Sequence, residues 1–217
     1  MTIYIDGFER SGNTYLAVCI GTTLGIDVSP QFTHLVSTLQ ERDKDSLFVV
    51  PVRDALPSIV SAKLYRDYQW QNDLPRQDKV FGREHERTGD PVELIQRYTE
   101  YTQYLLDHDE FFIAPFKEFT KDHNKVVDVM IKDYPQYSAV QRFTREEMID
   151  ICDKYYSDRN PDVNEKSNAY LNNFPREQAK EKREVEELFV SKYSKEVNKI
   201  QSNIDHLYKR YYREEAK

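Results

Sequence analysis

Residues 2–25 read TIYIDGFERSGNTYLAVCIGTTLG, and this stretch decides which fold the sequence predicts. Its first part, Thr2–Asp6, is rich in β-forming side chains and is followed by Gly7, which predicts a short strand. The part Asn13–Leu24 is largely apolar and is followed by Gly25, which predicts a helix that ends at a glycine. A strand, a glycine-containing turn and a helix are therefore expected in direct succession.

The same succession is expected further along the chain. The run Ser46–Val52 (SLFVVPV) is apolar at consecutive positions, which is typical of a strand buried on both faces of a parallel sheet. A second apolar run, Phe111–Phe116, predicts another strand. Helices are expected over residues 57–68, 91–106, 124–132 and 145–155. Such strand–loop–helix units predict an α/β fold in which helices cover a central parallel sheet.

Two polar stretches and a helical C-terminal region complete the expected organisation. Residues 69–90 are expected to form a long loop or lid, and residues 157–175 an irregular segment. From residue 176 onward, apolar side chains recur every three or four positions, which predicts one long helix, or two, packed on the body of the protein. A chain of 217 residues is expected to form a single domain.

Composition narrows the classes of function. Hydrophobic residues make up 39% of the chain, which is enough for a core and excludes a disordered protein. The net charge of −7 argues against binding of nucleic acid but allows a local basic pocket for one anion. No apolar run approaches the roughly 18 residues of a membrane span, and no signal peptide is expected. Cys19 and Cys152 form no motif and indicate a reducing compartment, so a cytoplasmic protein is expected.

The turn after the first strand has the frame of a phosphate-binding loop. Residues 7–14 (GFERSGNT) match G-x-x-x-x-G-x-[ST], with a predicted strand before and a predicted helix after, as the motif requires. The N–H groups at the start of the helix favour an anion, and the hydroxyls of Ser11 and Thr14 can add donors. A nucleotide-hydrolysing loop would carry Lys at the position of Asn13, whereas this loop carries its cation at Arg10. The alternative is a glycine-containing turn without a ligand.

A second candidate anion site follows the strand at 46–52. Arg53 stands at the end of that strand, and Ser61 stands about two turns into the helix that follows. An arginine in this place can bind a phosphate bidentately, and a hydroxyl on the helix can complete the site. Taken alone, an arginine after a strand is more often a surface residue.

Together, the two segments resemble the sulfotransferase family, whose sulfate donor is 3′-phosphoadenosine 5′-phosphosulfate (PAPS). Residues 10–15 (RSGNTY) are similar to the family's 5′-phosphosulfate loop, [KR]-S-G-[TN]-T followed by an aromatic residue. Residues 53–61 resemble its 3′-phosphate motif, R-[ND]-P-x-[DE]-x-x-x-S. Between them, Thr33-His34-Leu35 is similar to the T-H-L that carries the family's catalytic base. Residues 114–119 fall where the family has a strand and an acidic turn before a helix.

The resemblance implies a fold and a division of the chain. The family's fold is a P-loop-type three-layer α/β sandwich with a central parallel sheet flanked by helices. The similarity covers about residues 1–135, which would form the nucleotide-binding core of the single domain 1–217. Residues 136–217 would then be its mostly helical C-terminal part.

The sequence also departs from the family's pattern. Ala55 and Pro57 replace the Pro and the acid of the second motif, and Phe32 stands where many members have Lys. The family's C-terminal nucleotide-covering loop, R-K-G-x-x-G-x-W, is not recognisable. Arg176, with the basic residues that follow it up to residue 183, is a candidate for a reduced version. The alternative is a charged helix start that faces solvent.

The resemblance implies a role for each candidate residue. The loop amides from Ser11 to Thr14 would hold the 5′-phosphosulfate, and Arg10 would stabilise charge on the bridging oxygen. Arg53 would bind the 3′-phosphate, and His34 would act as the general base. The residues predicted to bind the donor are Arg10, Ser11, Gly12, Asn13, Thr14, Tyr15, Arg53, Ser61 and Arg176.

The expected reaction transfers a sulfuryl group from PAPS to an acceptor hydroxyl or amine, with adenosine 3′,5′-bisphosphate as the second product. No metal is expected, because the remaining histidines lack the spacing of metal ligands. One alternative is a non-catalytic nucleotide-binding protein on a sulfotransferase-like scaffold. Another is a P-loop kinase that depends on ATP and Mg²⁺.

Overall fold

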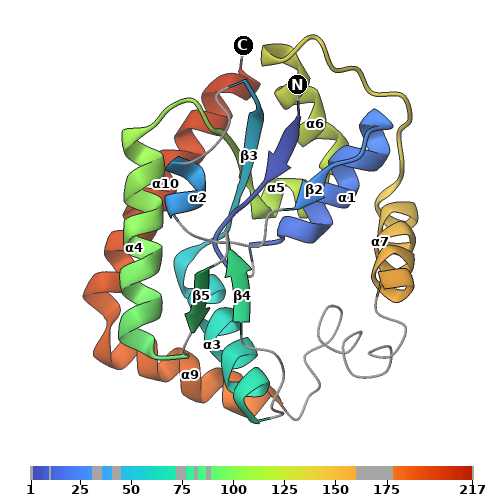
Figure 1. Cartoon of the computed structure of the whole chain (residues 1–217). Coiled ribbons are helices and arrows are strands. Elements are labelled where there is room, and N and C mark those ends of the chain that lie inside the picture. The colour runs from blue at the N-terminus through green and yellow to red at the C-terminus, as the bar shows by residue number, and fades with distance from the viewer. Residues whose placement is uncertain are drawn as a thin grey trace.

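The computed structural model describes residues 2–9, 11–30, 36–40, 45–71, 77–80, 83–86, 89–159 and 178–216. A parallel sheet lies at its centre, with strand order β2-β1-β3-β6 (Figure 1). Its main strands are β1 (Ile3–Ile5), β3 (Leu47–Val52) and β6 (Phe112–Pro115). The outermost strand beside β1 is β2 (Ser29–Pro30), which has only two residues. The predicted α/β class and the three main predicted strands are confirmed.

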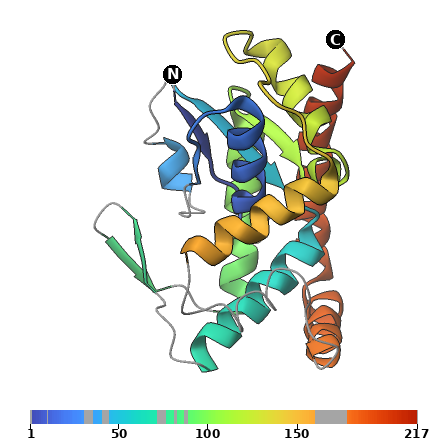
Figure 2. The same ribbon diagram turned by 90° about the vertical axis from the view of Figure 1, so that its right-hand side faces the viewer.

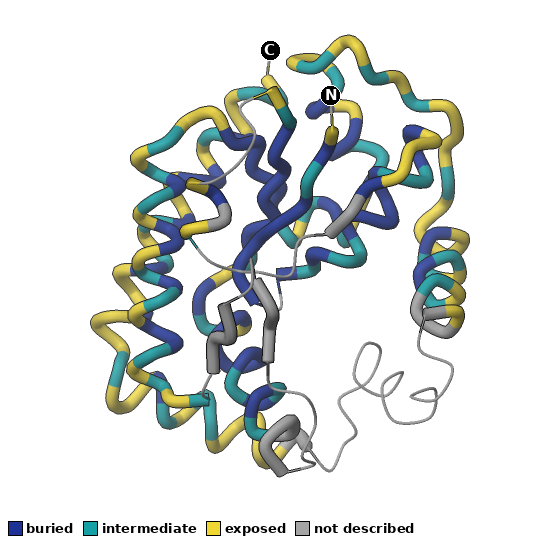
Figure 3. Tube along the Cα trace, in the orientation of Figure 1, coloured by how far each residue is buried: buried dark blue, intermediate teal, exposed yellow. Residues whose placement is uncertain are grey.

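Strand β3 explains why the sheet is covered on both faces. All six of its residues are buried. Leu47 and Val49 pack into one hydrophobic cluster, while Phe48, Val50 and Val52 pack into another. Successive side chains of a strand point to opposite faces, so an uninterrupted apolar run needs a cover on each side. Figure 3 shows the buried residues along the strands and on the helix sides that face them.

Helices provide both covers (Figures 1 and 2). One face packs against α1 (Asn13–Leu24), α5 (Phe116–Lys121) and α6 (His123–Asp133), and α7 (Arg145–Arg159) lies against α1. The helices on the other face are α2 (Val36–Gln40), α3 (Ala55–Gln71), α4 (Pro91–Asp107), α9 (Gln178–Lys192) and α10 (Ser194–Glu215).

The predicted helices are confirmed, and α1 has the predicted bounds. Gly25 ends α1 in the left-handed conformation, with φ +66°. Helix α5 was not predicted, because its six residues are too few to show a helical pattern beside the strand β6. Residues 160–177, which include most of the segment predicted to be irregular, lie outside the described residues.

The prediction of a long loop over residues 69–90 is wrong in part. Helix α3 continues to Gln71, and β4 (Gln77–Val80) pairs antiparallel with β5 (Arg83–Glu86). Val80 pairs with Arg83, so two residues, Phe81 and Gly82, connect the strands. A two-residue connection with glycine is a hairpin signal, and it was missed because the flanking residues are polar. In Figure 2 this hairpin stands out from the rest of the chain.

The C-terminal region forms two helices, as one of the alternatives for it predicted. Helix α9 ends before Tyr193, and α10 begins directly after it. The side chains of Phe189, Ile200 and Ile204 are buried in the same hydrophobic cluster as α3 and α4. The predicted packing of the apolar stripe on the body of the protein is therefore confirmed.

The two cysteines lie in one small apolar cluster between α1 and α7. Cys19 and Cys152 are both buried and free, and Val18 and Met148 pack beside them. Burial raises the pKa of the Cys19 thiol, so this side chain is protonated and apolar in character. In the described part of the chain, no helix has an apolar stretch long enough to cross a membrane.

Arg210 of α10 joins the C-terminal helix to the sheet. Its guanidinium donates hydrogen bonds to the carbonyl oxygens of Leu105 (2.7 Å), His108 (3.0 Å), Asp109 (2.7 Å) and Phe111 (3.0 Å). These carbonyls belong to the end of α4 and to its connection with β6. The last carbonyls of a helix lack partners within the helix, so Arg210 satisfies groups that would otherwise need water.

The substitution Arg210→Ala is expected to lower the free energy of unfolding by about 2–4 kcal/mol, because it leaves several partly buried carbonyls without a donor. Urea unfolding measures the change. Arg213→Ala is the matched control, since Arg213 is exposed and bonds to a carbonyl of its own helix, and it should cost less than about 0.5 kcal/mol. Equal effects of the two substitutions would contradict this interpretation.

Candidate functional site

The carboxyl ends of β1, β3 and β6 meet at one edge of the sheet, which is where α/β proteins bind their ligands. Three segments begin there: the glycine loop, defined as residues 6–12, the turn that starts with Arg53, and helix α5, which starts with Phe116. The main-chain N–H of Asp6 donates to the carbonyl oxygen of Val49 at 3.3 Å. The glycine loop therefore leaves the sheet alongside β3.

Both glycines of the loop are required by close contacts. A Cβ on Gly7 would lie 2.3 Å from the carbonyl oxygen of Pro51, so only glycine allows the loop to approach β3 this closely. Gly12 has φ +90°, and a Cβ there would lie 3.0 Å from Phe119 and 3.1 Å from Phe116. The loop is consequently packed against the strand on one side and against α5 on the other.

The Asn13 side chain closes the loop. Its Oδ1 accepts a hydrogen bond from the Gly7 N–H at 2.6 Å, and its Nδ2 donates to the Gly7 carbonyl at 3.0 Å. The Ser11 hydroxyl and the Ser11 N–H both donate to the carbonyl oxygen of Phe8, at 2.5 and 3.2 Å. In this structure the side chains of Asn13 and Ser11 thus hold the shape of the loop.

The start of α1 is suited to an anion. The N-cap residue of this helix is Gly12, which has no side chain to cap the helix end, and none of the first-turn residues is acidic. Gly12 and Thr14 are both partly exposed. The first N–H groups of a helix have no acceptor within it and carry partial positive charge, so the amides of residues 12–14 can bind a phosphate or sulfate group. Tyr15 stacks on Phe119, with ring centroids 6.1 Å apart.

Arg53 lies at the same edge as the glycine loop. Its guanidinium carbon is 4.7 Å from the centroid of the Phe116 ring. Gly12 approaches this same ring, as described above. The two sequence motifs, which are about 40 residues apart, therefore pack against a single aromatic side chain. Arg53 is partly exposed, so its side chain can also contact a ligand.

Ser61 lies on α3 and is 8% exposed. A neighbouring hydroxyl, which was not predicted, contacts the glycine loop: the buried Ser58 donates to the carbonyl oxygen of Glu9 at 3.0 Å. The three-residue spacing of Ser58 and Ser61 on one helix is the signal in the sequence that could have drawn attention to Ser58.

Glu9 forms a buried ion-pair cluster that sequence reasoning missed. Its side chain is 3% exposed and accepts from Arg66 Nε at 3.0 Å and from Arg97 Nη2 at 2.8 Å. Two guanidinium groups thus neutralise the Glu9 carboxylate. The three residues are far apart in the sequence, on the loop, α3 and α4, so no local spacing could have revealed them.

Some predicted residues lie outside the described residues. These are Arg10, the segment 33–35 with His34, and Arg176. The basic residues that follow Arg176 are placed on α9, where Lys180 pairs with Glu184 and Lys182 with Glu186, each at 3.8 Å. The two lysines therefore fit the alternative interpretation of this segment, a charged helix start that faces solvent.

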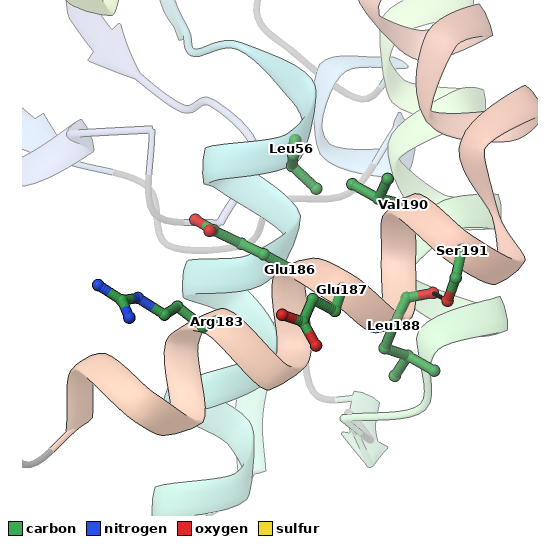
Figure 4. Close-up of a pocket in the computed structure, with 7 residues that line it drawn as sticks. All are labelled: Leu56, Arg183, Glu186, Glu187, Leu188, Val190 and Ser191. Carbon is green, nitrogen blue, oxygen red and sulfur yellow. Dashed lines mark hydrogen bonds between the residues drawn. The ribbon is translucent and has the colours of Figure 1, made fainter.

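A cavity of about 650 Å³ lies between α3 and α9 (Figure 4). Leu56, in the first turn of α3, lies on one side of it, and Arg183 lies beside it on α9. Its other lining residues are Glu186, Glu187, Leu188, Val190 and Ser191. Two glutamates make this cavity unsuited to a phosphate, so it is separate in its chemistry from the site at the edge of the sheet.

Comparisons with family models, with curated proteins and with solved structures found no match. Among the described residues, no group of three or more His, Cys, Asp or Glu side chains is arranged to hold a metal ion. The chemistry of the site therefore has to be inferred from the glycine loop, the start of α1 and Arg53.

The substitution Glu9→Gln is expected to lower the free energy of unfolding by about 3–5 kcal/mol, because it leaves Arg66 and Arg97 without their buried counter-charge. Chemical denaturation measures the loss. Glu93→Gln is the matched control: Glu93 is more exposed and lies 3.7 Å from Arg97, so its loss should cost less than about 1 kcal/mol. If Glu9→Gln is no more destabilising than the control, the cluster does not hold the loop.

Proposed function

We propose that this protein is a sulfotransferase that uses PAPS and belongs to a divergent branch of that family. One observation carries the proposal: Gly12 and Arg53, from two separate motifs, pack against the same Phe116 ring at the carboxyl edge of the sheet. The fold that goes with the proposal is the P-loop-type three-layer sandwich. The parallel sheet with helices on both faces supports that assignment.

In the proposed complex, the glycine loop binds the 5′-phosphosulfate. The amides of residues 12–14 and the positive end of α1 provide the donors. The hydrogen bonds between Asn13 and Gly7 organise the loop before the donor binds, which lowers the entropy that binding costs. Arg66 and Arg97 neutralise Glu9, so this carboxylate does not repel the incoming anion.

Arg53 binds the 3′-phosphate at the other end of the nucleotide. A guanidinium can donate two parallel hydrogen bonds to a phosphate, and the Phe116 ring beneath it restricts its orientation. Ser61 on α3 and Arg176 belong to this subsite in the proposal, on the strength of the resemblance.

The proposed chemistry is an in-line displacement at sulfur. The bond between sulfur and the bridging oxygen of the donor breaks, adenosine 3′,5′-bisphosphate leaves with the electron pair, and a new bond forms between sulfur and the acceptor oxygen or nitrogen. His34 takes the proton of the acceptor, and Arg10 stabilises the charge that develops on the bridging oxygen. Positioning and preorganised positive charge supply most of the acceleration.

A thermal-shift comparison tests the proposed donor. Adenosine 3′,5′-bisphosphate should raise the melting temperature, since a ligand at 100 times its Kd stabilises by about 2.7 kcal/mol. Adenosine 5′-phosphate, which lacks the 3′-phosphate, should stabilise less at the same concentration. If ATP with Mg²⁺ stabilises the protein and adenosine 3′,5′-bisphosphate does not, the proposal is refuted and a kinase is favoured.

The substitution Arg53→Ala should weaken binding of adenosine 3′,5′-bisphosphate at least tenfold, or about 1.4 kcal/mol, and change the affinity for adenosine 5′-phosphate less than about twofold. Isothermal titration calorimetry measures both. Arg142→Ala is the control, because Arg142 is exposed and pairs with Asp128 on α6. Equal losses for the two nucleotides would show that Arg53 does not bind the 3′-phosphate.

A non-catalytic nucleotide-binding protein is the second candidate. It is favoured by the ion pairs of Lys180 and Lys182 within α9, which take these cations out of a nucleotide-covering loop. Release of adenosine 3′,5′-bisphosphate from PAPS in the presence of acceptors separates the two candidates. The kinase alternative is disfavoured because Asn13, at the position of the kinase lysine, bonds to Gly7.

A further inference from the structure

Tyr98 of α4 contacts both halves of the proposed donor site. Its ring stacks on Phe8 of the glycine loop, with centroids 3.9 Å apart and an interplanar angle of 7°. Its hydroxyl donates a 2.6 Å hydrogen bond to the main-chain carbonyl oxygen of Arg53. The side chain is 1% exposed. Burial also raises its pKa, so the hydroxyl keeps the proton that it donates.

We propose that Tyr98 is a positioning residue that sets the separation between the glycine loop and Arg53, and thereby makes the site select nucleotides with phosphates at both the 5′ and the 3′ position. The inference rests on the proposed function. Tyr98 need not touch the nucleotide, because it acts through the main chain of Arg53 and through Phe8.

The contacts around residues 53–55 show why the carbonyl bond matters. Helix α10 holds the two residues that come after Arg53 in the chain. The Tyr208 hydroxyl donates to the Asp54 carboxylate at 3.0 Å, and the Ala55 N–H donates to Gln201 Oε1 at 2.9 Å. These contacts tie the turn to α10. On the other side of the turn, the Tyr98 side chain links the main chain of Arg53 to the ring of Phe8.

A turn that is held in place before binding lowers the cost of binding. If the carbonyl of Arg53 loses the hydrogen bond from Tyr98, the main chain at this residue gains freedom, and binding of the 3′-phosphate must restrict it again. That cost falls on nucleotides that carry a 3′-phosphate. A nucleotide with only a 5′-phosphate uses the glycine loop and does not bear it.

Tyr101, one helical turn further along α4, is a matched control. It is 2% exposed, and its hydroxyl donates to the carbonyl oxygen of Asp6 at 2.7 Å. Its ring lies edge-on to Phe8, with centroids 6.3 Å apart. Tyr101→Phe thus removes the same kind of buried hydrogen bond as Tyr98→Phe, but from the glycine loop and not from Arg53.

The experiment measures the affinities of the wild type, Tyr98→Phe and Tyr101→Phe for adenosine 3′,5′-bisphosphate and adenosine 5′-phosphate by calorimetry. Tyr98→Phe should weaken binding of the bisphosphate about tenfold and that of the monophosphate less than about twofold. Tyr101→Phe should leave the ratio of the two affinities unchanged. In an Arg53→Ala background, Tyr98→Phe should cause no further loss of bisphosphate affinity, because its route to the 3′-phosphate is already gone.

Each other outcome overturns a defined statement. Equal losses for both nucleotides in Tyr98→Phe, or an additive effect with Arg53→Ala, would make Tyr98 a purely structural residue while leaving the proposed function intact. A wild type that does not prefer the bisphosphate would overturn the proposed function and this inference together. If Tyr98→Phe does not fold, Phe8→Leu breaks the other contact of Tyr98, and an unchanged ratio of affinities in that variant would overturn the inference.

Discussion

The close approach of Gly7 to strand β3 is the constraint on which the site depends. A Cβ at Gly7 would lie 2.3 Å from the carbonyl oxygen of Pro51, so any other residue would push the glycine loop away from the sheet. Pro51 is two residues before Arg53. The same contact that shapes the loop therefore also places it next to the strand that ends in Arg53, and the Asn13 side chain keeps the loop closed in that position.

A protein with a net charge of −7 can form an anion site only if positive groups are concentrated locally. Two features make the carboxyl edge of the sheet suitable for an anion. Helix α1 begins at a glycine N-cap and has no acidic residue in its first turn, so the positive end of the helix is not opposed by a nearby carboxylate there. The Glu9 carboxylate of the loop is buried against Arg66 and Arg97, so its charge is compensated inside the protein.

Local patterns predicted the elements and the two motifs but not the functions of single side chains. Ser11 and Asn13 were predicted to take part in donor binding, and in the structure their side chains bond within the loop. The sequence showed that a polar side chain was present at each position, but not its partner. The polar hairpin β4–β5 was missed for a related reason, because no apolar alternation marks its strands.

The sequence by itself determined the parallel α/β class, the bounds of α1 and the order of the glycine loop and Arg53 along the chain, because these follow from hydrophobic periodicity and from glycine at two positions. Only the tertiary structure decided which distant side chains meet. Phe116 joins the two motifs, and Tyr98 contacts the glycine loop and the Arg53 main chain at once. Such contacts arise from the way helices α4 and α5 pack on the sheet, and packing between distant segments leaves no local pattern in a single sequence.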